Sequence, residues 1–158
     1  MSEKPEVSEF GSVDPAPASE DMAVEKLRAV LCDESERMFQ RMRALFALRN
    51  IGGEAAVDSL ADAFSSTSAL LKHEIAYVLG QMQDDHAVPH LINRLEDTRE
   101  DVMVRHEAAE ALGAIGNRTA MSTLEKFVGD EEIVVAESCE VAIDLLNWVS
   151  SDRLDYSE

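Results

Sequence analysis

The sequence predicts an all-α fold, an α-solenoid in which pairs of helices stack along one axis. Three observations support this class. Seven Gly and four Pro are too few for the turns of an all-β protein of 158 residues, whereas Ala and Leu, which favour helices, are abundant. Apolar residues recur at spacings of three and four. The whole pattern then repeats at intervals of 31 and 33 residues, which is typical of stacked helix pairs.

The domain limits follow from where this periodicity begins and ends. Residues 1–20 are rich in Pro, Ser and Glu and lack periodicity, so we expect a disordered acidic tail or linker. Helical patterning begins near Asp21, where apolar residues first recur with helical spacing. We therefore expect one repeat domain over residues 21–150 and a short C-terminal tail over residues 151–158.

Each of three repeat units contains an Ala- and Leu-rich helix, a short break and a second helix. A fourth, incomplete unit is expected at about residues 132–148. The first helices include residues 44–49, 75–80 and 108–113; the breaks are residues 50–53, 83–85 and 116–118; the second helices include residues 56–60, 87–91 and 120–124.

Two glycines inside predicted helices indicate close packing. Gly80 and Gly113 each cost a helix about 1 kcal/mol relative to Ala, and close approach of a neighbouring helix would explain them. Pro89 falls in the first turn of its helix, where a missing N–H does little harm. The short units, and the Leu-Gly that closes the helix in units two and three, resemble HEAT-like repeats.

Charge and cysteine content exclude several classes of function. A net charge of −18 leaves no basic stripe for a phosphate backbone, so we expect no nucleic-acid partner. The charge favours encounter with a cationic partner, although solubility alone would also account for it. No apolar run is long enough to span a membrane and no signal peptide is evident, so no membrane contact is expected. Cys32 and Cys139 are too few for a disulfide framework, and a cytoplasmic location is expected.

Two His-Glu dipeptides, His73-Glu74 and His106-Glu107, lie 33 residues apart at equivalent places in units two and three. Because stacked repeats superpose equivalent positions, the two imidazoles should share one face of the solenoid, as should the two carboxylates. Two His and one carboxylate form the facial triad of non-haem Fe(II) sites, which leaves positions open for O₂ or substrate. The sequence therefore indicates a metal site.

A single His-Glu dipeptide on a helix is usually a solvated pair, and the repeat argues against that interpretation here. The equivalent place holds Met42-Arg43 in unit one and Glu137-Ser138 in unit four. The dipeptide is therefore not required by the fold, and its presence in two adjacent units favours a ligand role.

Other metal and anion signals are weaker. His86 and His90 have the spacing of a zinc clamp, yet they straddle a break and Pro89. Neither His-Glu pair continues into the zincin motif, since Tyr77 and Glu110 occupy the position of its second His. The cations before the pairs, Lys72 and Arg105, would bind an anion or, more simply, balance the acidic surface.

Longer segments around these pairs closely resemble deoxyhypusine hydroxylase. The resemblance extends over residues 12–148 and is carried by residues 68–74, 80–83, 103–107 and 110–115. It implies a HEAT-like solenoid with a non-haem di-iron centre. Such enzymes use O₂ to hydroxylate the deoxyhypusine side chain of a translation initiation factor.

The chain resembles one half of that family's two-part architecture, with two His-Glu pairs instead of four. Residues 12–17 look like the linker that enters the second half, and residues 137–142 look like its last helix. By resemblance, His73, His106 and Glu107 would ligate one iron, and Glu74 would be a ligand or a catalytic carboxylate that orients substrate.

The resemblance also implies a partner. The second iron would come from a second copy in a homodimer or from a separate N-terminal half, and the substrate would be a cationic polyamine side chain. Two alternatives stay open, a non-catalytic acidic scaffold and an inactive fragment of a longer product. A zinc or mononuclear iron hydrolase is a weaker alternative, because no third His in register completes a zinc site.

Overall fold

The computed structural model describes residues 3–151, and within that range it contains helices and loops but no strands. The α-helices are α1 Val24–Leu31, α2 Met38–Ile51, α3 Glu54–Asp62, α4 Ala69–Met82, α5 Val88–Glu96, α6 Val102–Ile115, α7 Met121–Phe127 and α8 Ile133–Ser150. Three short 3₁₀ turns lie between them, η1 Ala63–Ser65, η2 Asp85–Ala87 and η3 Arg118–Ala120.

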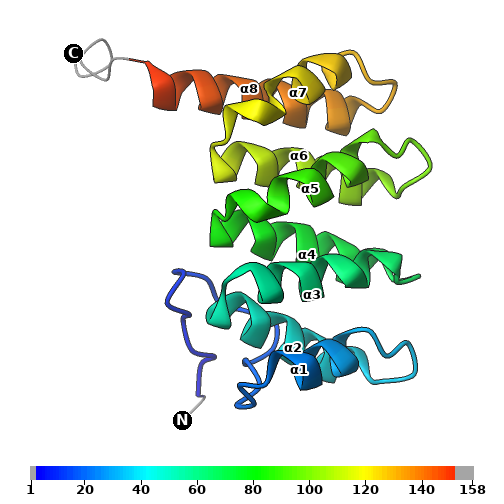
Figure 1. The fold of residues 1–158 in the computed structure, drawn as a ribbon. Coiled ribbons are helices and arrows are strands. Elements are labelled where there is room, and N and C mark those ends of the chain that lie inside the picture. The colour runs from blue at the N-terminus through cyan, green and yellow to red at the C-terminus, as the bar shows by residue number, and fades with distance from the viewer. Residues whose placement is uncertain (1–2, 152–158) are drawn as a thin grey trace.

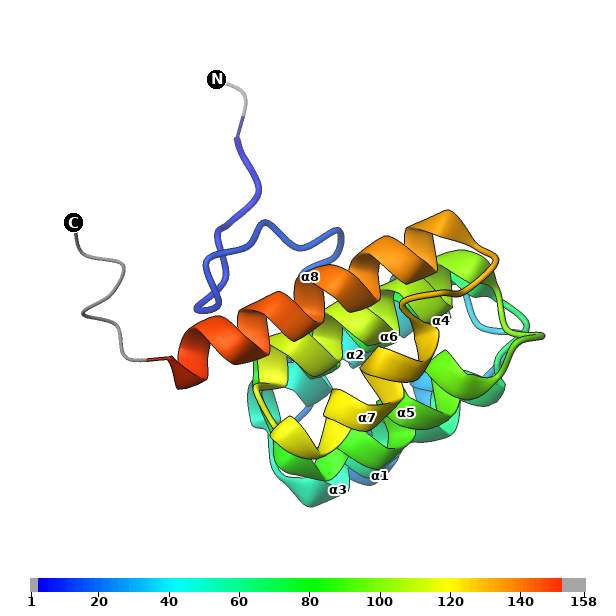
Figure 2. The same ribbon diagram turned by 90° about the horizontal axis from the view of Figure 1, so that it is seen from above.

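The helices form two layers that run the length of the molecule (Figures 1 and 2). The longer helices α2, α4, α6 and α8 stack in one layer, with α6 packed between α4 and α8. The shorter helices α1, α3, α5 and α7 make up the other layer. This arrangement confirms the predicted α-solenoid of helix pairs.

The pairing of helices differs in phase from the prediction. Helix α1 packs on α2, α5 on α6 and α7 on α8, so these three shorter helices pair with the longer helix that follows them. Helix α3, in contrast, has more contact with α2, which precedes it, than with α4. Helix α8 covers the predicted fourth unit and packs on α7, and within residues 3–151 no second helix follows it. A period fixes the spacing of equivalent residues but does not say where a unit begins.

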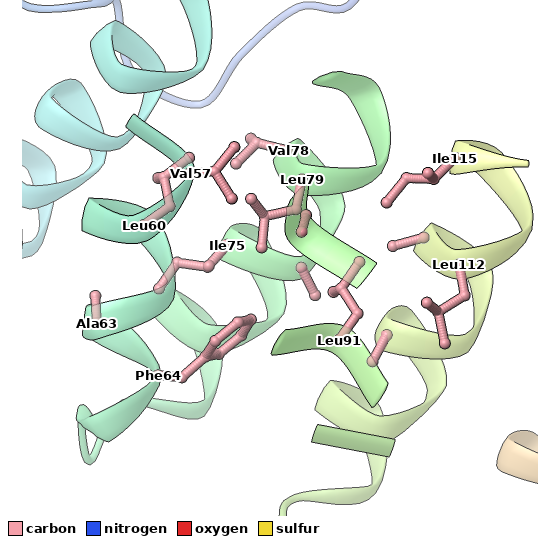
Figure 3. Packing of buried hydrophobic residues seen from close by; sticks show 14 of the residues in the cluster. Val57, Leu60, Ala63, Phe64, Ile75, Val78, Leu79, Leu91, Leu112 and Ile115 are labelled. Carbon is pink, nitrogen blue, oxygen red and sulfur yellow. The ribbon is translucent and has the colours of Figure 1, made fainter. Parts of the chain in front are cut away.

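A continuous hydrophobic core lies between the two layers. It joins α3 and η1 to α4, and α5 to α6 (Figure 3). Labelled there are Val57, Leu60, Ala63, Phe64, Ile75, Val78, Leu79, Leu91, Leu112 and Ile115. Because every repeat shares this core with its neighbours, the position of α4 relative to α6 is fixed by packing.

The two helical glycines lie where neighbouring helices of the long layer approach most closely. A Cβ on Gly80 would lie 3.1 Å from the Cα and Cβ of Ala111, and one on Gly113 would lie 3.0 Å from Ala142 Cβ. The expected close packing is confirmed. Pro89 lies in the first turn of α5, as predicted.

We expect Gly113→Val to lower the free energy of unfolding by about 2 kcal/mol, because the added atoms would force α6 and α8 apart. Urea denaturation followed by circular dichroism measures the change. Gly129→Ala is the matched control, since open space surrounds that position. Equal stability of the two variants would contradict the packing explanation.

The cations that precede the His-Glu pairs bind structural partners. The Arg105 side chain is buried and donates from Nε to the Leu95 carbonyl at 3.0 Å and from its two terminal nitrogens to Asp130. Lys72 Nζ lies 2.6 Å from Glu100. These contacts link neighbouring repeats. The expectation that Arg105 balances charge at the surface is therefore wrong, because its side chain is buried, whereas Lys72 does pair with an acidic residue.

The end of the N-terminal segment packs against the solenoid. Residues 3–20, for which no helix was predicted, contain none, and α1 begins at Val24, three residues after the predicted start near Asp21. Asp14, however, pairs with the buried Arg49 of α2 at 2.6 Å, and the Ser19 N–H donates to the Arg43 carbonyl. Gln81 of α4 also donates from Nε2 to Ser12 Oγ at 3.2 Å, so this segment is tied to two helices. The predicted C-terminal tail lies outside the described residues apart from Ser151.

Candidate metal centre

The two histidines occupy matching places in adjacent helices of the long layer. His73 is the fifth residue of α4 and His106 is the fifth residue of α6. Both helices begin at a side-chain cap, Ser68 accepting from the Leu71 N–H and Asp101 from the Met103 N–H. Equal distances from cap to His, together with direct packing of α4 on α6, place both rings on the same face.

Glu107 joins the two histidines. Its Oε2 lies 3.1 Å from His73 Nε2 and 3.6 Å from His106 Nε2, and the residue is only 7% exposed. Ligand atoms that bind one metal ion at about 2.1 Å at right angles lie about 3 Å apart. The chemistry of these three donors matches the non-haem Fe(II) set of two His and one carboxylate. Glu107 lies close to each imidazole, whereas the three donors of this site whose atoms all lie within 4.8 Å of one another are those of His106, Glu107 and Glu110.

Glu74 lies on the other side of the His73 ring. Its Oε2 is 3.7 Å from His73 Nδ1, whereas Glu107 meets the Nε2 side of the same ring. The structure thus brings His73, His106 and Glu107 together around one carboxylate oxygen and leaves Glu74 beside that group. Burial raises the pKa of the Glu74 carboxyl.

Burial is also the main reason why the pKa of Glu107 is raised, and the nearby carboxylates of Glu110 and Glu74 raise it further. The imidazoles of His73 and His106 act in the opposite direction. Concentrated, desolvated negative charge of this kind is the usual environment of a metal cation or a cationic ligand.

Two residues of the site were not among the predicted site residues. Glu110, one helical turn after His106, has a carboxylate oxygen within 4.8 Å of donor atoms of both His106 and Glu107. Ser138 of α8 lies 2.5 Å from His106 Nδ1 through its Oγ. The sequence could have indicated Glu110, because it follows His106 by four residues in the same helix and so lies on the same helix face. For Ser138 the signal was its place in unit four, which is equivalent to that of Glu74 and Glu107 in the two His-Glu pairs.

A pocket of about 380 Å³ adjoins the site between α4 and α6. Its acidic wall is formed by Glu107 and Glu110 of α6, and the opposite wall includes Tyr77 and Gln81 of α4. A cationic chain that entered this pocket would end beside the His and Glu donors.

A second group of candidate ligands lies in the layer of shorter helices. Asp58 of α3 accepts from His86 at 2.8 Å, and His90 Nε2 lies 3.4 Å from the same oxygen. The hydrogen bond to Asp58 raises the pKa of the His86 imidazole and lowers that of the carboxyl. All three side chains are partly or largely solvent-exposed, so an ordinary surface ion pair accounts for the group.

Comparison with known proteins places this geometry in a family. The HEAT repeats family model matches residues 63–144, and the PBS lyase HEAT-like repeat model matches residues 40–66. The chain belongs to the HEAT-repeat family. Among residues 3–151, no helix combines the length and apolar character that a membrane span requires.

Within that class the chain is similar to deoxyhypusine hydroxylases, as the sequence motifs indicated. It is 50% identical to deoxyhypusine hydroxylase of Xenopus laevis over 155 residues, which cover 98% of this chain and 51% of that protein. The Homo sapiens enzyme is 46% identical over 98% of this chain and 51% of its own length.

The structure of human deoxyhypusine hydroxylase in complex with glycerol superposes with a TM-score of 0.87 at 49% identity, covering 91% of this chain and 50% of that one. The chain thus spans about half the length of the relatives that it matches.

Proposed function

We propose that this chain is a deoxyhypusine hydroxylase half-unit, an oxidoreductase that hydroxylates the deoxyhypusine side chain of a translation initiation factor with O₂. The observation that carries the proposal is the Glu107 carboxylate, which lies close to the Nε2 atoms of both His73 and His106. The chain is also 49% identical in sequence to a deoxyhypusine hydroxylase of known structure. A translation factor as substrate also supports a cytoplasmic location.

His73, His106 and Glu107 would hold one iron ion. Bound iron would supply the activation of O₂ for insertion of an oxygen atom into a C–H bond. Glu74 would act as a further ligand or as the carboxylate that orients the substrate amine, and its half-buried position beside His73 supports this role.

The protein's own contribution to the reaction is to bind and position a cation. Glu107 and Glu110 both line the pocket; half of the Glu110 side chain is exposed, whereas Glu107 is nearly buried. A protonated polyamine side chain would neutralise this acidic wall, and the formal charge of −18 would steer it toward the protein.

The second iron of the centre would come from a second protein unit, because the chain has two His-Glu pairs and spans half of its relatives. Two exposed apolar side chains, Leu70 at the start of α4 and Met103 at the start of α6, flank the histidines and would be covered by such a partner. A homodimer would place two equivalent sites across a two-fold axis, and a separate N-terminal half would serve equally.

The test measures native mass, iron content and product in one preparation. After anaerobic loading with Fe(II), we expect a dimer with two irons, or one iron per chain in complex with an N-terminal half. Incubation with O₂, a reductant and a deoxyhypusine-containing factor should add the mass of one oxygen atom to the factor. An iron-free monomer that leaves the factor unchanged, even with a complementary half supplied, would overturn the proposal. The Glu107→Gln variant is the matched inactive control.

The non-catalytic scaffold makes a different prediction. If the chain only binds other proteins and has no catalytic role, His73→Ala and His106→Ala should leave its biological activity intact. Loss of that activity in both variants would exclude the scaffold.

A further inference from the structure

We propose that Ser138 is a positioning residue for His106, holding its imidazole as the tautomer whose Nε2 lone pair points toward Glu107. The proposal rests on the iron site proposed above and adds to it a residue from the next repeat. It is carried by the hydrogen bonds around one buried hydroxyl group.

The direction of these hydrogen bonds follows from the single proton of a serine hydroxyl. Ser138 Oγ lies 2.6 Å from the Val134 carbonyl oxygen and 2.5 Å from His106 Nδ1. A carbonyl oxygen can only accept, so the hydroxyl proton goes to Val134. The remaining lone pair of Oγ must then accept the proton of His106 Nδ1, because two acceptors at that distance would repel each other.

A proton fixed on Nδ1 leaves Nε2 of the neutral ring without a proton, so the lone pair of Nε2 is free to bind a metal ion. That nitrogen is the one that faces Glu107 Oε2, at 3.6 Å. Glu110 does not compete for Nδ1, since its nearest oxygen lies 3.9 Å away and is too distant for a hydrogen bond. Metal-binding histidines commonly donate their second N–H to such a partner, which sets ring orientation.

The backbone of α8 holds this hydroxyl in place. Ser138 is 6% exposed, and its proton is committed to the carbonyl one turn back in its own helix. One turn further on, Ala142 makes the close contact with Gly113 that brings α8 against α6. The small residues at that crossing therefore allow a side chain as short as serine to reach His106.

Within residues 3–151, His73 Nδ1 makes no hydrogen bond comparable to that of His106 Nδ1. The nearest charged partner there is Glu74 at 3.7 Å, outside hydrogen-bond distance. The two candidate ligands thus differ: a buried hydroxyl holds the His106 ring, whereas no such hydrogen bond fixes the orientation of the His73 ring. Loss of Ser138 should affect His106 alone.

Ser138→Ala tests the proposal, with Ser59→Ala as the matched control. Ser59 is also buried and its hydroxyl also donates to the carbonyl one turn back, that of Ala55, but among residues 3–151 it has no hydrogen bond to a histidine. Titration calorimetry with Fe(II) under anaerobic conditions should show about a 10- to 100-fold weaker affinity for Ser138→Ala and no change for Ser59→Ala. Ser138→Thr, which keeps the hydroxyl, should restore most of the affinity.

Nitrogen-15 NMR of the imidazole rings in the metal-free protein gives a second readout that does not depend on iron. We expect His106 in the parent chain to carry its neutral-form proton on Nδ1, and Ser138→Ala to shift the ring toward the Nε2-protonated tautomer. A parent His106 protonated on Nε2, or a Ser138→Ala variant that binds Fe(II) as tightly as the parent, would overturn the proposal. Failure of the parent to bind iron would count against the proposed function, whereas the tautomer measurement would still decide the role of Ser138.

Discussion

Replacing Glu107 by Gln is expected to weaken Fe(II) binding by at least about 100-fold, more than the loss of a residue that only orients a ligand. The carboxylate oxygen is the atom that both histidines face, at 3.1 and 3.6 Å, and a neutral amide offers the metal no negative charge there. Titration calorimetry with Fe(II) measures the loss. Glu125→Gln, an exposed change on α7, is the control and should bind iron like the parent.

The same substitution should make the metal-free protein more stable at neutral pH. Burial raises the pKa of Glu107 in the folded state, so ionisation of this group destabilises the fold. The parent therefore loses stability as the pH rises from the unfolded-state pKa through the raised folded-state pKa, whereas the Gln variant does not titrate there. We expect a higher melting temperature for Glu107→Gln at pH 8 and a smaller difference at pH 5.

These two effects have opposite signs, and together they distinguish a binding residue from a structural one. If the Glu107 carboxylate stabilised the fold, neutralising it would lower both the stability of the protein and its affinity for metal. A lower melting temperature for metal-free Glu107→Gln at pH 8 would contradict our interpretation of this carboxylate.

Arg105→Ala should lower the free energy of unfolding by about 3 to 5 kcal/mol, the usual cost of removing one partner of a buried ion pair. The guanidinium group is 2% exposed and satisfies the Leu95 carbonyl and both oxygens of Asp130. Truncation would leave a nearly buried carboxylate and a carbonyl oxygen without partners. It would also remove the contact of the cation with the Phe127 ring, 5.4 Å away.

Urea denaturation gives the size of this effect. Arg99→Ala removes an arginine that is 94% exposed and should change stability by less than about 0.5 kcal/mol. Arg105→Lys keeps the charge but not the forked geometry, so its loss of stability should be intermediate between those of Arg105→Ala and Arg99→Ala. A loss below 1 kcal/mol for Arg105→Ala would show that the repeats do not depend on this ion pair.

The sequence predicted those features of the fold that depend on regular spacing. The recurrence of Ala-, Leu- and Gly-containing helices indicated a solenoid, and the equal positions of His73 and His106 in their units indicated that the two rings would meet. The first prediction is confirmed, and the distances to Glu107 agree with the second. That these residues bind iron remains a prediction.

Features that depend on contacts between elements could not be predicted from the spacing of residues in the sequence. Arg105 finds its partners 10 and 25 residues away, in the helix before its own and in the loop between α7 and α8. Ser138 reaches His106 across 32 residues through the crossing of α6 and α8. A polar residue has no period of its own, so only the packed structure reveals which neighbour it will meet.

The helix caps before the two histidines have a consequence for how this site tolerates change. Ser68 and Asp101 fix where α4 and α6 begin, and each His follows its cap by five residues. One residue turns an α-helix by about 100°, so a single insertion between cap and His would swing the ring away from Glu107. The same insertion in the loop before either cap would only lengthen that loop, at little cost. Related sequences should therefore vary in loop length ahead of these helices while keeping the short interval from cap to His constant.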